Sequence, residues 1–134
     1  IHETNCIISK QKNKHMYTIT KEFHFSAAHT LNHLPENHPC SRMHGHNYKV
    51  IIELQSDKLN EYGFVKDYRE LDDFKKWIDN HLDHKNLNDF FGDGEFTTSE
   101  RMAAFIYKVF KFWFPELSAV TISETDKTFA TYRP

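Results

Sequence analysis

The sequence predicts an α+β fold, in which two helices pack on one face of an antiparallel sheet. Three observations predict it: two strand-like segments come first, two segments with helical periodicity follow, and a short hairpin-like segment closes the chain. Helices grouped between strand pairs are typical of α+β domains, whereas βα alternation indicates a parallel sheet. With 134 residues the chain is long enough for one domain with a hydrophobic core.

The first two strands show the clearest patterns. Residues 16–25 (MYTITKEFHF) alternate apolar and polar side chains, and residues 47–55 (NYKVIIELQ) are rich in β-branched and aromatic types. Residues 30–39 contain two Pro and two Asn, which predicts a loop between the strands. A turn region at 57–63 and a short extended piece at 64–66 are expected next.

The first helix is predicted after Asp67, which forms a capping-box pattern with Glu70. A helical stripe then repeats at i, i+3, i+7 and i+11, formed by Leu71, Phe74, Ile78 and Leu82. Residues 83–94 are expected to form a loop.

The second helix is expected to begin at Thr97 or Thr98 and to stop near Pro115. Its apolar side is predicted to comprise Ala103, Ile106, Val109, Phe110 and Trp113. Residues 119–124 and 129–132 then form the closing hairpin. These strands are too few to close a barrel alone, so we expect an oligomer that covers the open sheet edges.

Residues 1–15 are polar and are expected to form an N-terminal extension, with a single domain at 16–134. The extension lacks the apolar core of a signal peptide, and no apolar run approaches the roughly 20 residues that cross a bilayer. The net charge of −2 gives no electrostatic reason to expect nucleic acid binding. We therefore expect a cytoplasmic protein with neither a membrane nor a nucleic acid as partner. A disulfide between Cys6 and Cys40 is possible, but a cytosolic chain favours a metal-binding or catalytic thiol.

The strongest functional signal is a cluster of three imidazoles and one thiol within 18 residues. His44 and His46 would point to the same side of an extended strand, and His29 would arrive from the neighbouring strand. Each His alone has an ordinary structural interpretation, but the set indicates a Zn²⁺ site. Three protein ligands leave a fourth position open, as in catalytic zinc sites.

Cys40 has three interpretations. It could be a small buried residue, a fourth ligand that closes a structural zinc site, or a thiolate close to zinc that acts as a base or nucleophile. The sequence pattern of the cluster leaves these interpretations open.

Three further motifs could carry chemistry. Asp83-His84 is either a helix terminus or a carboxylate–imidazole pair for proton transfer. Thr97 and Glu100 fit a capping box, although the same helix start could hold a ligand. Glu124 ends an apolar strand and, if it is buried, needs a partner such as the N–H donors of a purine-like or pterin-like ring.

Taken together, these motifs resemble the 6-pyruvoyltetrahydropterin synthase family over residues 16–132, and most of all its 6-carboxytetrahydropterin branch of queuosine biosynthesis. The resemblance rests on five motifs in order: Phe23-x-Phe25-x-Ala27-Ala28-His29, Cys40-x3-His44-Gly45-His46, Leu82-Asp83-His84-x2-Leu87-Asn88, Thr98-Ser99-Glu100 and Glu124-Thr125. The short spacer between Cys40 and His44 is the feature that favours this branch.

The resemblance implies a zinc-dependent lyase that converts 7,8-dihydroneopterin triphosphate to 6-carboxytetrahydropterin with loss of acetaldehyde and triphosphate. It implies zinc ligation by His29, His44 and His46, and catalysis by Cys40 with the pair Asp83 and His84. Pterin binding is implied for Glu124, helped by Thr98, Ser99 and Glu100, and the triphosphate could be bound by Arg42, Lys85, Lys127 or Arg133. The implied architecture is the tunnelling fold, a homo-oligomer (trimer-based, hexamer or tetramer) whose strands join into a barrel.

Two alternatives remain after the resemblance is considered. One is the pyruvoyl-forming reaction of the same family, which eliminates triphosphate and keeps the side chain. The other is a non-catalytic zinc protein with a closed site of one Cys and three His.

Overall fold

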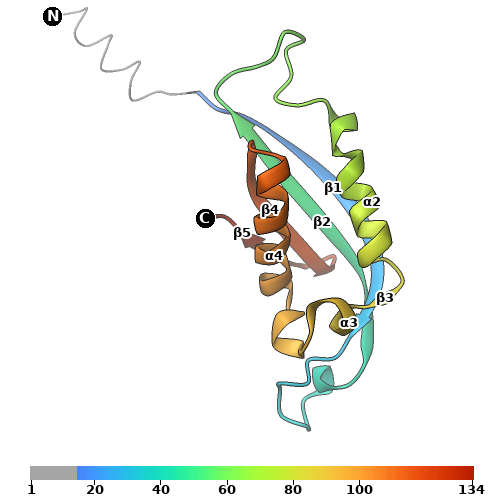
Figure 1. Cartoon of the computed structure of the whole chain (residues 1–134). Helices are drawn as coiled ribbons and strands as arrows, with labels where there is room; N and C mark the ends of the chain where they lie inside the picture. The colour runs from blue at the N-terminus through green and yellow to red at the C-terminus, as the bar shows by residue number, and fades with distance from the viewer. Residues whose placement is uncertain (1–14) are drawn as a thin grey trace, which may run out of the picture.

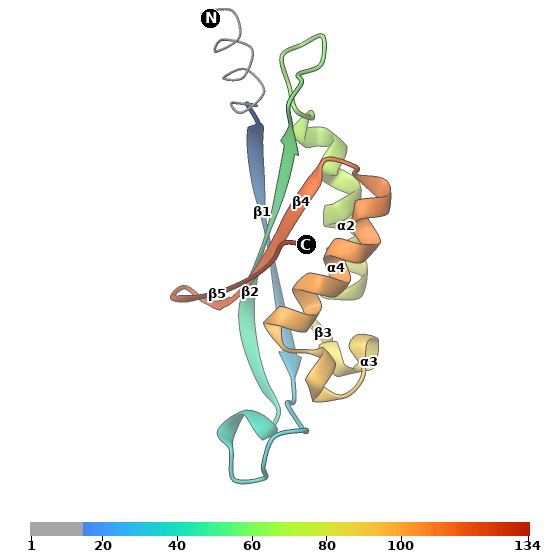
Figure 2. The same ribbon diagram turned by 90° about the vertical axis from the view of Figure 1, so that its left-hand side faces the viewer.

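The computed structural model describes residues 15–134, so the expected extension, apart from its last residue, lies outside the described residues. The division into an extension and a domain stays a prediction. Five strands form one sheet in the order β3-β1-β2-β4-β5. The helices lie on one face of this sheet and the other face is uncovered (Figures 1 and 2). The predicted α+β architecture is therefore confirmed.

Two long antiparallel strands, β1 (Tyr17–His29) and β2 (His44–Ser56), form the centre of the sheet. Both are longer than the sequence predicts: β1 continues to His29 and β2 begins already at His44. The added segments contain Ala and Gly, which have a low strand propensity, and pairing of the two strands extends them.

The C-terminal hairpin is confirmed as β4 (Leu117–Thr125) and β5 (Thr128–Tyr132), with β4 antiparallel to β2. The remaining strand, β3 (Lys85–Asn86), is only two residues long and pairs in parallel with β1. The sheet is therefore antiparallel except at this short edge strand.

The predicted capping box is present, but it caps a 3₁₀ helix, η2 (Tyr68–Leu71), that leads into α2 (Asp72–His81). The Asp67 carboxylate accepts from the amide of Arg69 at 2.9 Å, and the Glu70 carboxylate accepts from the amide of Asp67 at 3.2 Å. The predicted stripe is buried at all four positions, Leu71, Phe74, Ile78 and Leu82. This stripe packs in the core against the inward side chains of β1 and β2.

The second helix, α4 (Ser99–Trp113), begins after Thr98, whose hydroxyl accepts from the amide of Arg101 at 3.3 Å. Thr98 is thus the cap, and the alternative capping box from Thr97 is wrong. Ala103, Ile106 and Phe110 are buried as predicted, whereas Trp113 is 68% exposed at the helix end. No helix in residues 15–134 is both long enough and apolar enough to span a bilayer.

The prediction of a loop over residues 83–94 is wrong. This segment contains β3, the short helix α3 (Leu87–Phe91) and the start of a 3₁₀ helix, η3 (Gly94–Phe96). The extended piece expected at 64–66 is not part of a strand. Elements of two to five residues are too short to show a period, so contacts with the rest of the fold determine them. A third 3₁₀ helix, η1 (Pro39–Ser41), begins at the last residue of the predicted 30–39 loop and carries Cys40.

Candidate metal centre and its surroundings

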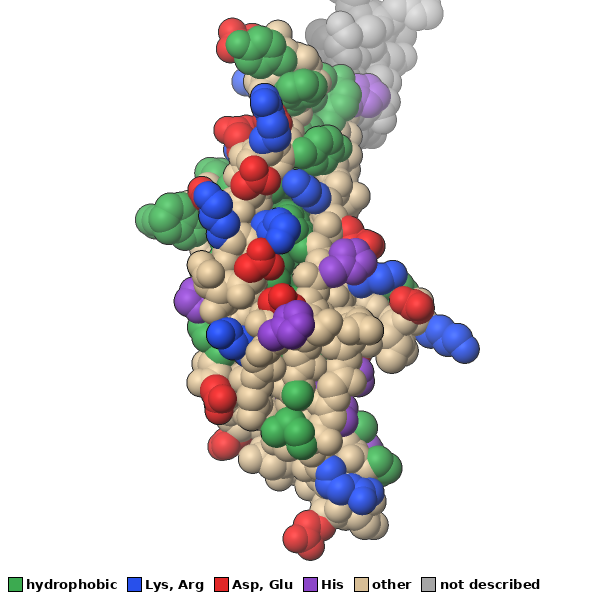
Figure 3. All heavy atoms as spheres, turned by 90° about the vertical axis from the view of Figure 1, so that its right-hand side faces the viewer, with side chains coloured by type: hydrophobic (Ala, Val, Ile, Leu, Met, Phe, Trp, Pro, Cys, Tyr) green, Lys and Arg blue, Asp and Glu red, His purple; other side chains and the backbone are tan. Residues whose placement is uncertain are grey.

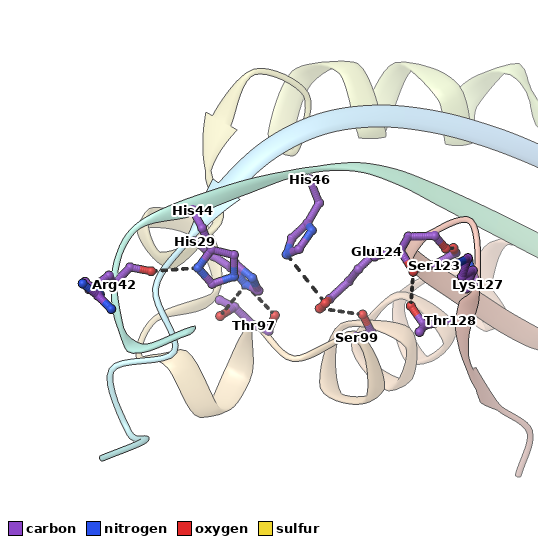
Figure 4. A network of polar contacts seen from close by, with 11 residues as sticks. His29, Arg42, His44, His46, Thr97, Ser99, Ser123, Glu124, Lys127 and Thr128 are labelled. Carbon is purple, nitrogen blue, oxygen red and sulfur yellow. Dashed lines mark hydrogen bonds and ion pairs between the residues drawn. The ribbon is translucent and has the colours of Figure 1, made fainter. Parts of the chain in front are cut away.

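Three histidine side chains converge where β1 ends and β2 begins (Figure 4). His29 and His44 are direct partners across the antiparallel pair, and His46 follows two residues later on the same face. One ligand nitrogen from each ring lies within 4.8 Å of the other two. Strand alternation alone predicted this arrangement, and the structure brings these residues together as expected.

Backbone carbonyls orient two of the three rings. The Nδ1–H of His29 donates to the carbonyl oxygen of Thr97 at 3.0 Å, and the Nδ1–H of His44 donates to that of Arg42 at 2.7 Å. A carbonyl only accepts, so each ring carries its proton on Nδ1 and keeps the Nε2 lone pair free. Hydrogen bonds of this kind commonly fix the tautomer of metal-binding His.

The Nε2 atoms of His29 and His46 are buried without a hydrogen-bond partner among the described residues. Buried polar atoms rarely remain unpaired in native proteins. Three converging imidazoles match the donor set of a zinc site with an open position. The residues present therefore fit a Zn²⁺ ion.

Burial favours the neutral, metal-binding form of these rings. It lowers the pKa of His29 below its ordinary value, and the proximity of His44 lowers it further. Burial likewise lowers the pKa of His46, although the charge of Glu124 opposes this effect. Both rings therefore stay unprotonated near neutral pH.

Glu124 lies between the histidine cluster and a neighbouring hollow. Its Oε2 is 3.6 Å from Nε2 of His46, and its Oε1 accepts a hydrogen bond from the Ser99 hydroxyl at 2.9 Å (Figure 4). The hollow has a volume of about 270 Å³ and is lined by Ser99, Glu100, Ile122, Glu124, Thr128, Phe129 and Ala130. A carboxylate at the edge of a partly apolar hollow can accept N–H donors from a planar ring. Thr128 and Phe129 were not predicted as site residues, because only the pairing of β4 with β5 brings them to this hollow.

Thr98 and Glu100, the other two residues predicted to contact the pterin ring, differ in their positions. Thr98 uses its hydroxyl to cap α4, and Glu100 is exposed but lines the hollow.

Cys40 is a half-buried free thiol on η1. Its amide donates to Nδ1 of His38 at 3.1 Å, and its carbonyl accepts from the amide of Leu31 at 3.0 Å. Within residues 15–134, the candidate metal-binding group consists of His29, His44 and His46 and does not include Cys40. This geometry favours the open three-His site over the closed site that includes the thiol.

Asp83 and His84 form the expected carboxylate–imidazole pair, with Asp83 Oδ2 and His84 Nδ1 2.9 Å apart. The amide of Ser26 donates to the other Asp83 oxygen at 2.9 Å, and this bond is the main reason that the pKa of Asp83 is lowered. His84 is exposed and has a positive φ of 56°.

The Asp83–His84 pair does not join the histidine cluster. His84 lines a hollow of about 560 Å³ together with Ser26, Ala28, Gly45 and Asn47, and Ala27 and His46 also line it. Ser26, Ala28, Gly45 and Asn47 alternate with the inward-facing Ala27, His29, His44 and His46 along the two strands, so their side chains belong to the uncovered face of the sheet. Within one chain, His84 therefore faces the uncovered side of the sheet and the imidazole cluster faces the helices, and His46 is the cluster residue that also lines the hollow at His84.

The four basic residues that were candidates for triphosphate binding lie in different parts of the structure. Lys85 lines the same hollow as His84, whereas Lys127 is in the turn between β4 and β5 near Thr128 (Figure 4). Arg133 forms an ion pair with Glu53, and Arg42 is exposed next to His44. On the face shown in Figure 3, acidic and basic side chains are interspersed without a large patch of one sign.

Comparison with known proteins places this geometry in a family. The family model described as 6-pyruvoyl tetrahydropterin synthase matches residues 18–134, nearly all of the described chain. The chain belongs to the 6-pyruvoyl tetrahydropterin synthase family. This result confirms the resemblance drawn from the five motifs.

Individual members of the family are similar over most of their length. A 6-carboxy-5,6,7,8-tetrahydropterin synthase from Synechocystis sp. is 39% identical over 123 residues, which cover 87% of this chain and 93% of that protein. A Bacillus subtilis protein of the same name is 30% identical, with 96% and 92% covered. The structure of Caenorhabditis elegans 6-pyruvoyl tetrahydropterin synthase has a TM-score of 0.75 at 28% identity, with 90% of this chain and 96% of that chain covered. The tunnelling fold of the family is therefore confirmed.

Proposed function

We propose that this family member is a zinc-dependent lyase that converts 7,8-dihydroneopterin triphosphate and one water molecule to 6-carboxytetrahydropterin, with release of acetaldehyde and triphosphate. The observation that supports it most is the convergence of three imidazoles next to a carboxylate at the edge of a hollow, because two of the rings have buried Nε2 atoms with no hydrogen-bond partner among the described residues. His29, His44 and His46 would hold the metal. When bound, Zn²⁺ supplies Lewis acidity toward the side-chain hydroxyls of the substrate.

Glu124 would anchor the pterin ring by accepting its N–H donors. The hydroxyl of Ser99 already holds one oxygen of this carboxylate, which leaves Oε2 for the ring. Because Oε2 is 3.6 Å from Nε2 of His46, a ring bound there would extend its side chain toward the metal cluster. Phe129 provides an apolar surface in the same hollow.

Cys40 would act as the base that removes a proton from the substrate side chain, and the Asp83–His84 pair would transfer the second proton. Asp83 keeps its charge because the amide of Ser26 stabilises the carboxylate, so it can orient the imidazole of His84. The pair lies on the opposite face of the sheet from the cluster. A site that includes both therefore combines two copies of the chain, in line with an oligomer whose strands join into a barrel.

The carboxy-forming reaction is preferred to the pyruvoyl-forming one for two reasons. Only three residues separate Cys40 from His44, and the Synechocystis and Bacillus subtilis relatives carry the carboxy-forming name. The likeness to the Caenorhabditis elegans structure supports the pyruvoyl-forming reaction as the second candidate.

Zinc content and product identity test this proposal. We expect close to one zinc per chain, and acetaldehyde together with a carboxypterin by mass spectrometry after incubation with 7,8-dihydroneopterin triphosphate. A product that retains a pyruvoyl side chain would establish the second candidate.

The Cys40→Ala variant separates catalysis from structure. It should keep its zinc and fold but lose turnover. If the zinc is lost and the chain unfolds, the closed structural site is correct and the lyase proposal fails.

A further inference from the structure

The main chain directly after His29 is held by one side chain, that of Asn88 on α3. Its Oδ1 accepts from the amide of Thr30 at 2.7 Å, and its Nδ2 donates to the carbonyl of Thr30 at 3.1 Å and to that of Gly92 at 3.0 Å. A second, longer bond of 3.4 Å joins the Thr30 hydroxyl to the same Oδ1. One amide thus binds both backbone groups of the residue that follows a candidate metal ligand.

The side-chain amide of Asn88 pairs with the backbone of β1 just beyond the point where the edge strand β3 ends. β3 pairs with β1 only at two positions, Ala27 with Lys85 and Ala28 with Asn86. A side-chain amide offers the same donor and acceptor as a peptide group. Asn88 therefore takes the place of a next strand residue opposite Thr30, and the backbone on both sides of His29 is hydrogen-bonded.

The segment that carries Asn88 also contacts the ring of His29 and the loop beyond it. The amide of Gly94 donates to Oδ1 of Asn32 at 2.7 Å, and three residues later the carbonyl of Thr97 accepts from the His29 ring. Thr97 and Gly94 are buried, and Thr97 donates its hydroxyl to the Gly94 carbonyl at 3.2 Å. The main chain next to His29 and the ring of His29 are thus positioned by one short stretch, which runs from Asn88 to Thr97.

We propose that Asn88 is a positioning residue that fixes His29 in its metal-binding orientation. The proposal rests on the proposed function only in that the three His bind a metal ion. Without Asn88, the Thr30 backbone loses its partners and the end of β1 is free to move away from β2. The Nε2 atoms then no longer meet at one point, and the metal binds more weakly.

The test measures Zn²⁺ affinity directly, by competition with a chromophoric chelator, on the full chain stripped of metal. We expect Asn88→Ala to bind Zn²⁺ about 10- to 100-fold more weakly than the unmodified chain, the range that partners of metal ligands typically show. The Asn88→Asp variant keeps the acceptor for Thr30 but loses the donors, and we expect a smaller loss of affinity. It also tests the proposal if the Ala variant does not fold.

Asn60 offers a matched control, because its side chain also binds backbone groups: its Oδ1 accepts from the amides of Tyr62 and Phe64 at 2.9 and 3.0 Å. It lies in the connection between β2 and η2, away from the cluster. Asn60→Ala should leave Zn²⁺ affinity unchanged.

Each outcome bears on the proposal. Unchanged Zn²⁺ affinity in both Asn88 variants would overturn it and leave the lyase proposal intact. An equal loss in Asn60→Ala would also overturn it, since the effect would then be general destabilisation. If the unmodified chain binds Zn²⁺ but gives no pterin product, the lyase proposal fails while the role of Asn88 stands. Failure of the unmodified chain to bind Zn²⁺ overturns both.

Discussion

Gly94 offers a sharp stability test of the contact between η3 and the loop after His29. A Cβ atom at this position would lie 2.5 Å from Cα of Leu31, 2.6 Å from the amide nitrogen of Asn32 and 2.7 Å from the carbonyl oxygen of Thr30. All three atoms belong to the backbone, so no flexible side chain can move aside. Gly94→Ala must therefore displace the chain on one side of the contact.

The magnitude follows from two costs. Overpacking of a buried site costs about 1–3 kcal/mol. Separation of the Gly94 amide from the Asn32 oxygen adds about 1 kcal/mol. We expect Gly94→Ala to lower the free energy of unfolding by about 2–4 kcal/mol, which at about 2 cal/mol/K of unfolding entropy per residue lowers Tm by roughly 7–15 °C.

The assay is urea unfolding of the metal-free chain, followed by circular dichroism at a fixed protein concentration, because subunit association also shifts apparent stability. Gly45→Ala is the control: its Cβ would meet only the carbonyl oxygen of Ala27, at 3.4 Å, and its cost should stay below about 1 kcal/mol. Equal stabilities of the two variants would refute the close contact at Gly94.

Three further predictions concern the site. Tyr48→Phe removes a buried hydroxyl that has no hydrogen-bond partner among the described residues, so urea unfolding should show unchanged or slightly higher stability, and a loss above about 1 kcal/mol would contradict this. The pKa of His29 is lowered in the folded state, so the contribution of this ring to stability is present above the unfolded pKa of 6.5 and is lost as the pH falls. The urea concentration at the unfolding midpoint of the metal-free chain should therefore be lower at pH 5.5 than at pH 7.5. Equal midpoints at the two pH values would argue against burial of this ring. Ser99→Ala releases one oxygen of Glu124, so KM for the pterin should rise more than kcat falls while zinc content stays unchanged; loss of zinc would show that this contact supports the metal site instead.

The sequence predicted the cluster well because its geometry is local. Once residues 44–46 are extended, His44 and His46 must share a face, and pairing with the preceding strand places His29 opposite them. Likewise, the stripe from Leu71 to Leu82 predicted the buried side of α2 because helical periodicity is a local property.

The surroundings of the cluster could not be predicted in the same way. The segment 83–94 has no periodicity, and its structure depends on partners about 58 positions earlier, as the contact between Asn88 and Thr30 shows. The sequence could not show whether Thr97 or Thr98 caps α4, because this also depends on a contact between distant residues. Thr97 is buried against His29, which leaves Thr98 to cap α4, and only the folded chain shows this contact.

The position of Asp83 and His84 links the proposed chemistry to assembly. The face of the sheet under the helices carries the histidine cluster and Glu124, while the uncovered face carries the proton-transfer pair. β3 pairs with β1 only at Ala27 and Ala28, so in the described chain the outer edge of β1 from Tyr17 to Phe25 has no strand partner, and β5 forms the opposite edge. Unpaired edges of this length favour pairing with another chain. Edge pairing between copies would join the sheets into a barrel and bring the pair of one copy toward the cluster of the next. If copies of the chain pair in this way, the assembly that pairs the strand edges would also complete the proposed site.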